Sequence, residues 1–199
     1  MAAFHGTARL VLASASPRRI ELLRAAGYEF DVVSRDIDER PVPFEAARDY
    51  VVRLADAKAA AVTSVVTRDR PILGADTVVV VDDRILGKPV DDDHAAEMLR
   101  LLSGRAHQVL TGVALRLGEH RAHAVECTIV HFDELGDEQI RWYVASGEPR
   151  DKAGAYAVQG LGSRFVVGIE GSYSNVVGLP IALVGRLLRE VTAVAIGRG

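Results

Sequence analysis

Two adjacent arginines, Arg18 and Arg19, fall where a helix is expected to begin. The preceding residues 10–13 are apolar and predict a buried strand, while Ser16 suits the N-cap and Pro17 the first helical position. A helix N-terminus is already electropositive, so two cations are unfavourable there unless an anion binds beside them. Backbone N–H groups, serine hydroxyls and guanidinium groups together suit a phosphate. The segment therefore predicts a polyphosphate site, and the alternative is a capped helix whose arginines face solvent.

Apolar residues on both sides of Asp76 make this aspartate the strongest catalytic candidate. It lies within residues 71–81, which predict a strand. A carboxylate in such a strand is costly unless it is paired, hydrogen-bonded or bound to a metal. Gly74 and Ala75 leave room for a ligand beside it. The alternative is an aspartate at a strand end that bonds to nearby backbone N–H groups.

A second acidic residue, Glu39, lies in a proline-punctuated loop over residues 36–43, together with Asp36 and Asp38. Composition alone favours a solvated loop. If the loop folds toward the arginine pair, Glu39 and Asp76 could share a divalent cation. Oxygen ligands fit Mg²⁺ or Mn²⁺ rather than zinc, and the six histidines show no metal-ligand spacing.

Three further polar residues are candidates for substrate contacts. Lys58 interrupts an apolar stripe of the helix expected over residues 45–64, so it either extends to the edge of the stripe or points into a polar cleft. Lys88 lies on a short turn between a glycine and a proline, from which it could reach phosphate oxygens. Gln159, in a glycine-rich region over residues 154–178, has an amide that could read a base edge or could face water. The glycines around these residues form neither a P-loop nor a dinucleotide-binding fingerprint.

Composition places the chain among soluble globular proteins. It has 199 residues, of which 49% are hydrophobic and 26% are charged, enough to bury a substantial core. A net charge of −3 argues against a nucleic-acid partner. The single cysteine, Cys127, allows no internal disulfide and is expected to be a core thiol in a reducing compartment. No segment is long and apolar enough to span a membrane, and the first residues lack a signal peptide, so a cytoplasmic location is expected.

The elements that must position these residues alternate between strands and helices early in the chain and then include antiparallel pairs. This order predicts an α/β fold with a mixed twisted sheet and flanking helices, and no break in composition divides residues 1–199, so a single domain is expected. A hairpin is expected around Gly118 and Glu119. Strands are expected over residues 10–13, 30–33, 71–81, 85–86, 109–117, 122–132 and 165–169, and helices over residues 17–26, 45–64, 92–102, 137–146 and 180–191.

Six blocks, taken together and in this order, resemble the Maf family of nucleoside triphosphate pyrophosphatases, which is named for septum formation. The resemblance covers almost the whole chain, and no single block is decisive. The blocks are SASPRR (residues 14–19), GADTVVV (74–80), LGKP (86–89), LSGRAHQVLTGVAL (102–115), GEPRDKAGAYAVQGLG (147–162) and GSYSNVVGLP (171–180).

The resemblance implies a Maf/ITPase-like fold with two lobes around a deep nucleotide cleft. It implies hydrolysis of a nucleoside triphosphate to the monophosphate and pyrophosphate with a divalent cation, Mg²⁺ or Mn²⁺. The family pattern assigns phosphate binding to Ser14, Arg18, Arg19, Lys58 and Lys88, the metal to Glu39 and Asp76, proton acceptance to Asp76, and base choice to Arg18, Thr77 and Gln159.

Within the family, an Asp-Thr pair at Asp76 and Thr77 with Gln159 resembles the branch that acts on dTTP and UTP, rather than the branch that acts on 7-methyl-GTP. Such an enzyme would clear nucleotide pools and could take part in cell-division arrest. Two alternatives remain: a broader activity on modified bases, and a regulator of septum formation that binds nucleotide without hydrolysing it. The expected partner is a small nucleoside triphosphate, and whether the chain forms a homodimer is left open.

Overall fold

The structure, a computed structural model, describes residues 9–196, so the N-terminal segment considered above, with His5, lies outside it. The described chain divides into two compact units. The first unit comprises the chain up to Asp76, Gly112–Val125 and the chain from Ile181 onward, and the second comprises Thr77–Thr111 and Glu126–Pro180. That residues 1–199 form a single domain stays a prediction.

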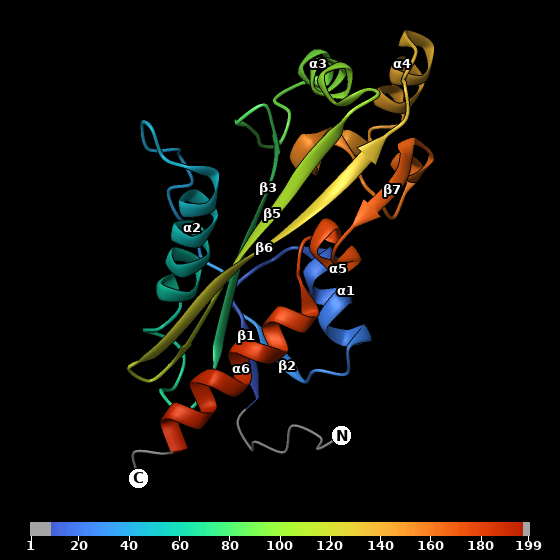
Figure 1. The fold of residues 1–199 in the computed structure, drawn as a ribbon. Helices are drawn as coiled ribbons and strands as arrows, with labels where there is room; N and C mark the ends of the chain where they lie inside the picture. Colours follow the sequence, from blue (N-terminus) through green and yellow to red (C-terminus); the bar gives the residue numbers. More distant parts are fainter. Residues whose placement is uncertain (1–8, 197–199) are drawn as a thin grey trace. The chain divides into compact units, whose positions relative to one another are not determined.

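The strands form a seven-stranded mixed sheet, which confirms the predicted fold class (Figure 1). The strand order is β2-β1-β3-β5-β6-β7, and β4 pairs with β3 outside this path. β1 runs parallel to β2 and to β3, whereas β4 runs antiparallel to β3 and β7 antiparallel to β6. The strands are β1 (Leu10–Leu12), β2 (Phe30–Val32), β3 (Ile72–Val81), β4 (Arg84–Leu86), β5 (Ala106–Leu117), β6 (His120–Phe132) and β7 (Val166–Glu170).

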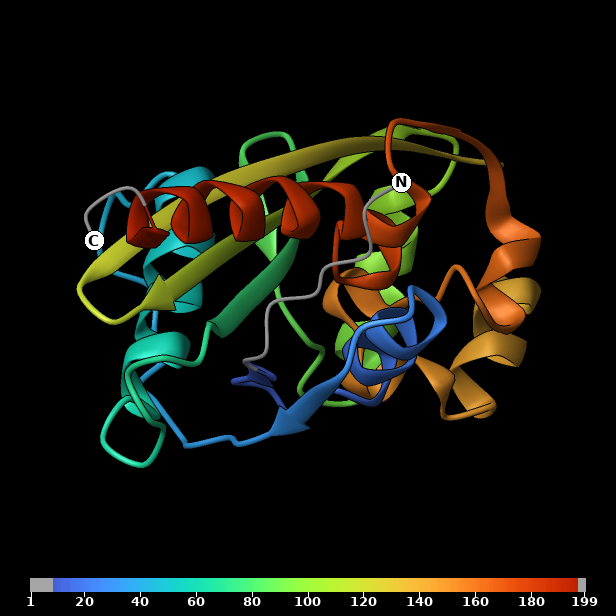
Figure 2. The same cartoon turned by 90° about the horizontal axis from the view of Figure 1, so that it is seen from below.

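Six α-helices and three short 3₁₀ helices connect the described strands. The helices are α1 (Pro17–Ala25), α2 (Ala47–Ala61), α3 (Asp92–Leu102), α4 (Asp137–Ala145), α5 (Tyr173–Val177) and α6 (Ile181–Ile196), with η1 (Glu148–Asp151), η2 (Ala153–Ala155) and η3 (Leu161–Phe165). The two-residue turn at Gly118 and Glu119 joins β5 and β6 into the predicted hairpin. In the first unit, α6 runs along the tip half of this hairpin (Figures 1 and 2).

In the first unit, α2 packs against the sheet so closely that two glycines are required. A Cβ added to Gly74 on β3 would lie 2.1 Å from the carbonyl oxygen of Ala55, and one added to Gly112 on β5 would lie 2.3 Å from the carbonyl oxygen of Val51. Only glycine allows backbones to approach to this degree. The positions of α2 and β3 relative to one another are therefore set by backbone contact.

The second unit has its own core, built from aromatic residues of several elements. Phe165 packs edge-to-face against Tyr143 on α4, with ring centroids 5.0 Å apart, and Phe132 on β6 packs in the same way against Tyr156, at 4.7 Å. All four rings are buried, and α3 adds Met98, Leu99 and Leu102. These contacts hold η1, η2 and η3 against the sheet and α3.

Two local predictions are wrong, and one helix was not predicted. α2 is shorter at both ends than residues 45–64. Val65, which continues the apolar spacing of Val51, Leu54 and Ala61, lies beyond the helix and is 55% exposed. Cys127 was expected in the core but is only partly buried. The short helix α5 was not foreseen, because a five-residue helix shows too little periodicity to separate it from a loop.

Candidate functional site

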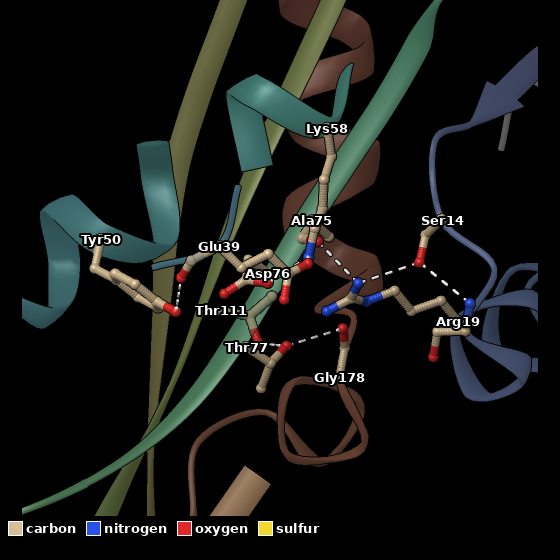
Figure 3. Close-up of polar contacts among 11 residues, drawn as sticks. Ser14, Arg19, Glu39, Tyr50, Lys58, Ala75, Asp76, Thr77, Thr111 and Gly178 are labelled. Carbon is tan, nitrogen blue, oxygen red and sulfur yellow. Dashed lines mark hydrogen bonds and ion pairs between the residues drawn. The ribbon is translucent and has the colours of Figure 1, made fainter. Parts of the chain in front are cut away.

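The predicted phosphate segment forms a closed loop between β1 and α1. Ser14 and Arg19 are both buried, with 8% of each exposed. The Arg19 Nη1 donates to the Ser14 Oγ at 3.2 Å and to the carbonyl oxygen of Ala75 at 2.8 Å (Figure 3). The Ser14 Oγ also accepts from the backbone N–H of Ser16 at 3.3 Å. One guanidinium thus joins the start of α1 to the residue before Asp76 on β3.

The start of α1 concentrates positive charge, as the sequence predicts. Burial lowers the pKa of the Arg19 guanidinium below its ordinary value, the charge of Asp76 opposes this shift, and that of Arg18 adds to it. An arginine remains charged in spite of such a shift. The first turn of α1 has no acidic side chain, and the Ser16 side chain makes no capping hydrogen bond. The site therefore holds a buried cation beside a half-buried one, an arrangement that suits an anion.

Lys58 joins the two predicted acidic residues. Its Nζ donates to Asp76 Oδ1 at 2.6 Å and lies 2.7 Å from Glu39 Oε1 (Figure 3). The Lys58 and Asp76 side chains are 15% and 11% exposed, whereas the Glu39 side chain is 53% exposed. Lys58 therefore does not merely extend to the edge of the apolar stripe, and the loop of Glu39 does fold toward Asp76. The structure brings together a lysine and two carboxylates from three separate segments of the chain.

Tyr50 fixes the position of Glu39 and was missed in the sequence analysis. Its hydroxyl donates to the carbonyl oxygen of Glu39 at 2.9 Å. Burial raises the pKa of the Tyr50 hydroxyl, and the charges of Asp76 and Glu39 raise it further. Tyr50 precedes Lys58 by two helical turns, so the two side chains share one face of α2. This spacing is the signal that could have identified it.

A second residue of α2, Arg53, holds the same loop further along. Its guanidinium pairs with the Glu45 carboxylate at 2.6 Å and donates to the carbonyl oxygen of Arg40 at 3.2 Å. The Glu39 side chain is thus presented by a loop that is hydrogen-bonded to α2 at two successive carbonyl oxygens, those of Glu39 and Arg40. The composition of residues 36–43 predicted only a solvated loop, because Tyr50 and Arg53, which hold this loop, lie outside it on α2.

The donor set around Lys58 fits a hard divalent cation. Glu39 Oε1 and Asp76 Oδ1 both lie within hydrogen-bond distance of the Lys58 Nζ, so the two carboxylates converge on the position that this ammonium occupies. Among residues 9–196, no group of three or more histidine, cysteine, aspartate or glutamate side chains could hold a metal ion. Two carboxylates with water and phosphate oxygens are the usual ligands of Mg²⁺ in nucleotide enzymes, whereas Ca²⁺ and zinc need more protein ligands.

Thr77 begins the second unit and takes part in a hydroxyl network there. Its Oγ1 lies 2.9 Å from the Thr111 Oγ1 and donates to the carbonyl oxygen of Gly178 at 3.3 Å (Figure 3). Thr111 is fully buried, and its Oγ1 also lies 3.5 Å from the carbonyl oxygen of Asn175. Each hydroxyl has one proton, so the two threonines share two donated hydrogen bonds among these three contacts. Thr111 lies in residues 102–115, one of the six blocks of the family resemblance, but nothing in the sequence around it predicts a role. The network fixes the rotamer of Thr77.

Lys88 and Gln159 are both exposed residues of the second unit. The turn of Lys88 is held by a hydrogen bond from the backbone N–H of Gly154 to the carbonyl oxygen of Gly87, at 3.0 Å. Gln159 lies in the short loop between η2 and η3. Their roles in substrate binding, like that of Arg18 in the first unit, stay predictions.

The described helices include none with the length and hydropathy needed to cross a membrane.

Sequence similarity identifies relatives across almost the whole chain. The profile of the family described as "Maf-like protein" matches residues 9–191. A dTTP/UTP pyrophosphatase of Escherichia coli O157:H7 is 51% identical over 184 residues, which cover 92% of this chain and 93% of that protein. A dTTP/UTP pyrophosphatase of Methylococcus capsulatus is 50% identical over 183 residues, covering 92% and 91%. Among solved structures, the Staphylococcus aureus Ham1 protein matches with a TM-score of 0.42 and 17% identity, covering 65% of this chain and 72% of that one.

Proposed function

This chain belongs to the Maf-like protein family, and from that premise we propose that it is a nucleoside triphosphate pyrophosphatase that hydrolyses dTTP and UTP. The products are the nucleoside monophosphate and pyrophosphate. Relatives that are about half identical over 92% of the chain are named dTTP/UTP pyrophosphatases. The observation that supports the proposal most directly is the Lys58 ammonium between the Asp76 and Glu39 carboxylates.

Positive charge in the first unit binds the triphosphate. The N–H groups at the start of α1, Ser14, Arg18 and Arg19 supply donors for phosphate oxygens, and Lys58 supplies a further point charge. Lys88 of the second unit is a further cation for the same role. Phosphoryl and nucleotidyl transfer need little covalent work from a protein, so positioning and neutralisation of charge dominate the rate.

Asp76 is the proton acceptor. A water oxygen attacks the α-phosphorus, the bond from that phosphorus to the bridging oxygen breaks, and pyrophosphate leaves with the bonding electron pair. The proton of the attacking water passes to the Asp76 carboxylate. Lys58, which holds Asp76 Oδ1 at 2.6 Å, fixes the direction in which this carboxylate faces. Asp76 is well suited to this role because it is held on a strand rather than on a loop.

Glu39 and Asp76 are the residues that would hold a divalent cation, Mg²⁺ or Mn²⁺. When bound, such a cation neutralises phosphate charge and lowers the pKa of water. As a ligand, Asp76 would then act through its charge as well as through proton transfer. Tyr50 and Arg53 keep the Glu39 loop in place for this purpose.

Thr77 and Gln159 select the base in this proposal, with Arg18 as the third contributor. An amide presents one donor and one acceptor, which matches the O4 and N3–H edge that thymine and uracil share. Cytosine presents the opposite pattern, and a polar group left unpaired in a buried site rejects the wrong base.

The test is pyrophosphate release by the purified protein from dTTP, UTP, CTP, GTP and 7-methyl-GTP, with Mg²⁺ or Mn²⁺. We expect the highest kcat/KM for dTTP and UTP. Nucleotide binding measured by calorimetry, without release of pyrophosphate from any of them, would instead favour the non-catalytic regulator. A best substrate that carries a modified base would favour the broader activity.

A further inference from the structure

The loop that presents Gln159 is held on a single carboxylate. Glu148, the first residue of η1, accepts hydrogen bonds from the backbone N–H of Leu161 at 2.9 Å, through Oε2, and of Gly162 at 3.0 Å, through Oε1. These two N–H groups belong to the second and third residues after Gln159. The C-terminal side of the loop is thus tied to Glu148, and all of these residues belong to the second unit.

The N-terminal side of the loop is tied to Tyr143 on α4. The Tyr143 hydroxyl accepts from the backbone N–H of Ala157 at 3.0 Å and donates to Glu148 Oε1 at 2.8 Å. Tyr143 is fully buried in the core of the second unit, so its hydroxyl is a fixed point. Gln159 therefore lies in the middle of a loop that is clamped two residues before it and two residues after it.

The two glycines beside Gln159 let the loop close on this clamp. A Cβ added to Gly160 would lie 2.1 Å from Glu148 Oε2, and one added to Gly162 would lie 2.7 Å from the Tyr143 Oη. A side chain at Gly160 would displace the Glu148 carboxylate from the loop, and a side chain at Gly162 would clash with the backbone of Ala157. Gly160 is thus explained by the Glu148 carboxylate and Gly162 by the Tyr143 hydroxyl and the Ala157 backbone, and not by a phosphate-binding motif.

The charge of Glu148 is stabilised by the loop itself. Burial, the largest single influence, raises the pKa of the Glu148 carboxyl, but the hydrogen bonds from Gly162 and Leu161, together with Tyr143 and the charge of Lys152, bring it below its ordinary value. A carboxylate accepts all three hydrogen bonds, whereas a side-chain amide at the same place has only one accepting oxygen.

We propose that Glu148 is a positioning residue for base selection: through the Leu161 and Gly162 N–H groups it sets the place of the Gln159 amide. The inference rests on the proposed function, in which Gln159 reads the base. Glu148 does not itself touch the nucleotide. Its carboxylate restricts the conformation of the glycine-rich loop and so fixes the position of the Gln159 side-chain amide.

The test compares Glu148→Gln with the wild type and with Glu138→Gln, which changes an exposed carboxylate of the same unit. The ratio of kcat/KM for dTTP to that for CTP is measured for each protein. We expect this ratio to fall about tenfold in Glu148→Gln, through a higher KM for dTTP with little change in kcat, and to be unchanged in Glu138→Gln. Amide hydrogen exchange at Leu161 and Gly162 should become faster in Glu148→Gln alone.

An unchanged ratio in folded Glu148→Gln, or an equal loss for dTTP and CTP, would overturn the role of Glu148. If Glu148→Gln does not fold, Tyr143→Phe serves in its place. It keeps the buried ring and removes both the acceptor for Ala157 and the hydroxyl that donates to Glu148 Oε1. An unchanged ratio in Tyr143→Phe would overturn the role of this clamp in placing Gln159. Absence of any preference for dTTP in the wild type would overturn the proposed function instead, while the exchange measurement still reports on the clamp.

Discussion

Lys58 reaches Asp76, at 2.6 Å, from a helix whose backbone already contacts the strand of Asp76 at Gly74. Ala55, which makes that backbone contact, lies three residues before Lys58 and therefore on the same face of α2. The packing of helix on strand and the ion pair thus share one interface. A change in how α2 packs on β3 would move the ammonium away from the carboxylate.

Asp76→Asn should lower kcat for dTTP by about 100-fold or more, the scale expected for loss of a general base. Thermal unfolding should still show a folded protein, because asparagine fills the same space and still offers an oxygen to Lys58. Asp93→Asn, at an exposed carboxylate in the first turn of α3, is the matched control and should keep full activity. Turnover near that of the wild type in folded Asp76→Asn would exclude Asp76 as the proton acceptor.

Removal of divalent cations should abolish pyrophosphate release, and Mg²⁺ or Mn²⁺ should restore it, because the acidic pair offers only hard oxygen ligands. Glu39→Gln should raise the concentration of cation needed for half-maximal activity by about tenfold, since one charged ligand is lost. The measurement is a titration of metal into protein dialysed against EDTA. Full activity after exhaustive dialysis would rule out the metal.

The two arginines of α1 should differ in their effects. Arg18→Ala and Arg19→Ala should both weaken triphosphate binding far more than nucleoside binding in calorimetry. Only Arg19→Ala should also lower the free energy of unfolding, by about 1–3 kcal/mol, because Ser14 and the Ala75 carbonyl lose their donor. Equal losses of affinity for triphosphate and nucleoside would mean that the arginines do not bind phosphate.

Gln159→Ala should change the ranking of substrates rather than abolish turnover. The preference for dTTP and UTP over CTP, measured as kcat/KM, should shrink by about tenfold, the effect of one hydrogen bond to a base edge. If GTP or 7-methyl-GTP proves to be the best substrate of the wild type, or if the ranking survives in Gln159→Ala, the assignment of Gln159 to base selection is wrong.

The protein should lose stability between about pH 6.5 and pH 4 through His107. Burial, with a smaller effect of His131, lowers the pKa of His107 from 6.5 to about 4. Between these pH values, His107 is protonated in the unfolded state but stays neutral in the folded state. The free energy of unfolding is therefore at its full value above pH 6.5 and falls as the pH is lowered toward 4. The loss amounts to about 3 kcal/mol.

Urea unfolding at several pH values measures this dependence. His107→Gln should flatten the curve below pH 6.5, and His123→Gln, at an exposed position of β6, should not. His107 bonds to the Tyr156 hydroxyl at 2.8 Å, so His107→Gln should also be less stable than the wild type at pH 7.5. A pH dependence that is identical in His107→Gln and wild type would contradict the assignment.

The core elements could be predicted from sequence because they combine apolar periodicity with clear end signals. The bounds of α3, with its N-cap Asp91 and its stop before Gly104, match the prediction at both ends. α2 was placed too long, because Val65 continues the apolar spacing even though the chain has already left the helix. Spacing reports which residues would share a face, but not where hydrogen bonding ends.

The sequence predicted that Glu39 would meet Asp76 only if the loop over residues 36–43 folded toward the arginine pair, and it could not show that the loop does so. Loop composition contains no information on Tyr50 and Arg53, which are what hold the loop to α2. The role of Glu148 was beyond the sequence for a similar reason. Its partners are backbone N–H groups, which every residue has, so no pattern of side chains marks them.

The two hydrogen bonds from Arg19 to Ser14 and Ala75 have a thermodynamic consequence. An arginine side chain has about 2 kcal/mol of rotamer entropy to lose when it is ordered. Here that loss occurs during folding, before a nucleotide arrives, so binding of the triphosphate has less disorder to remove. The protein without nucleotide is less stable as a result, because it must bury the Arg19 guanidinium without a bound phosphate beside it. Saturation with nucleotide should therefore coincide with a marked rise in resistance to heat, which makes the folded state of this protein sensitive to the nucleotide supply around it.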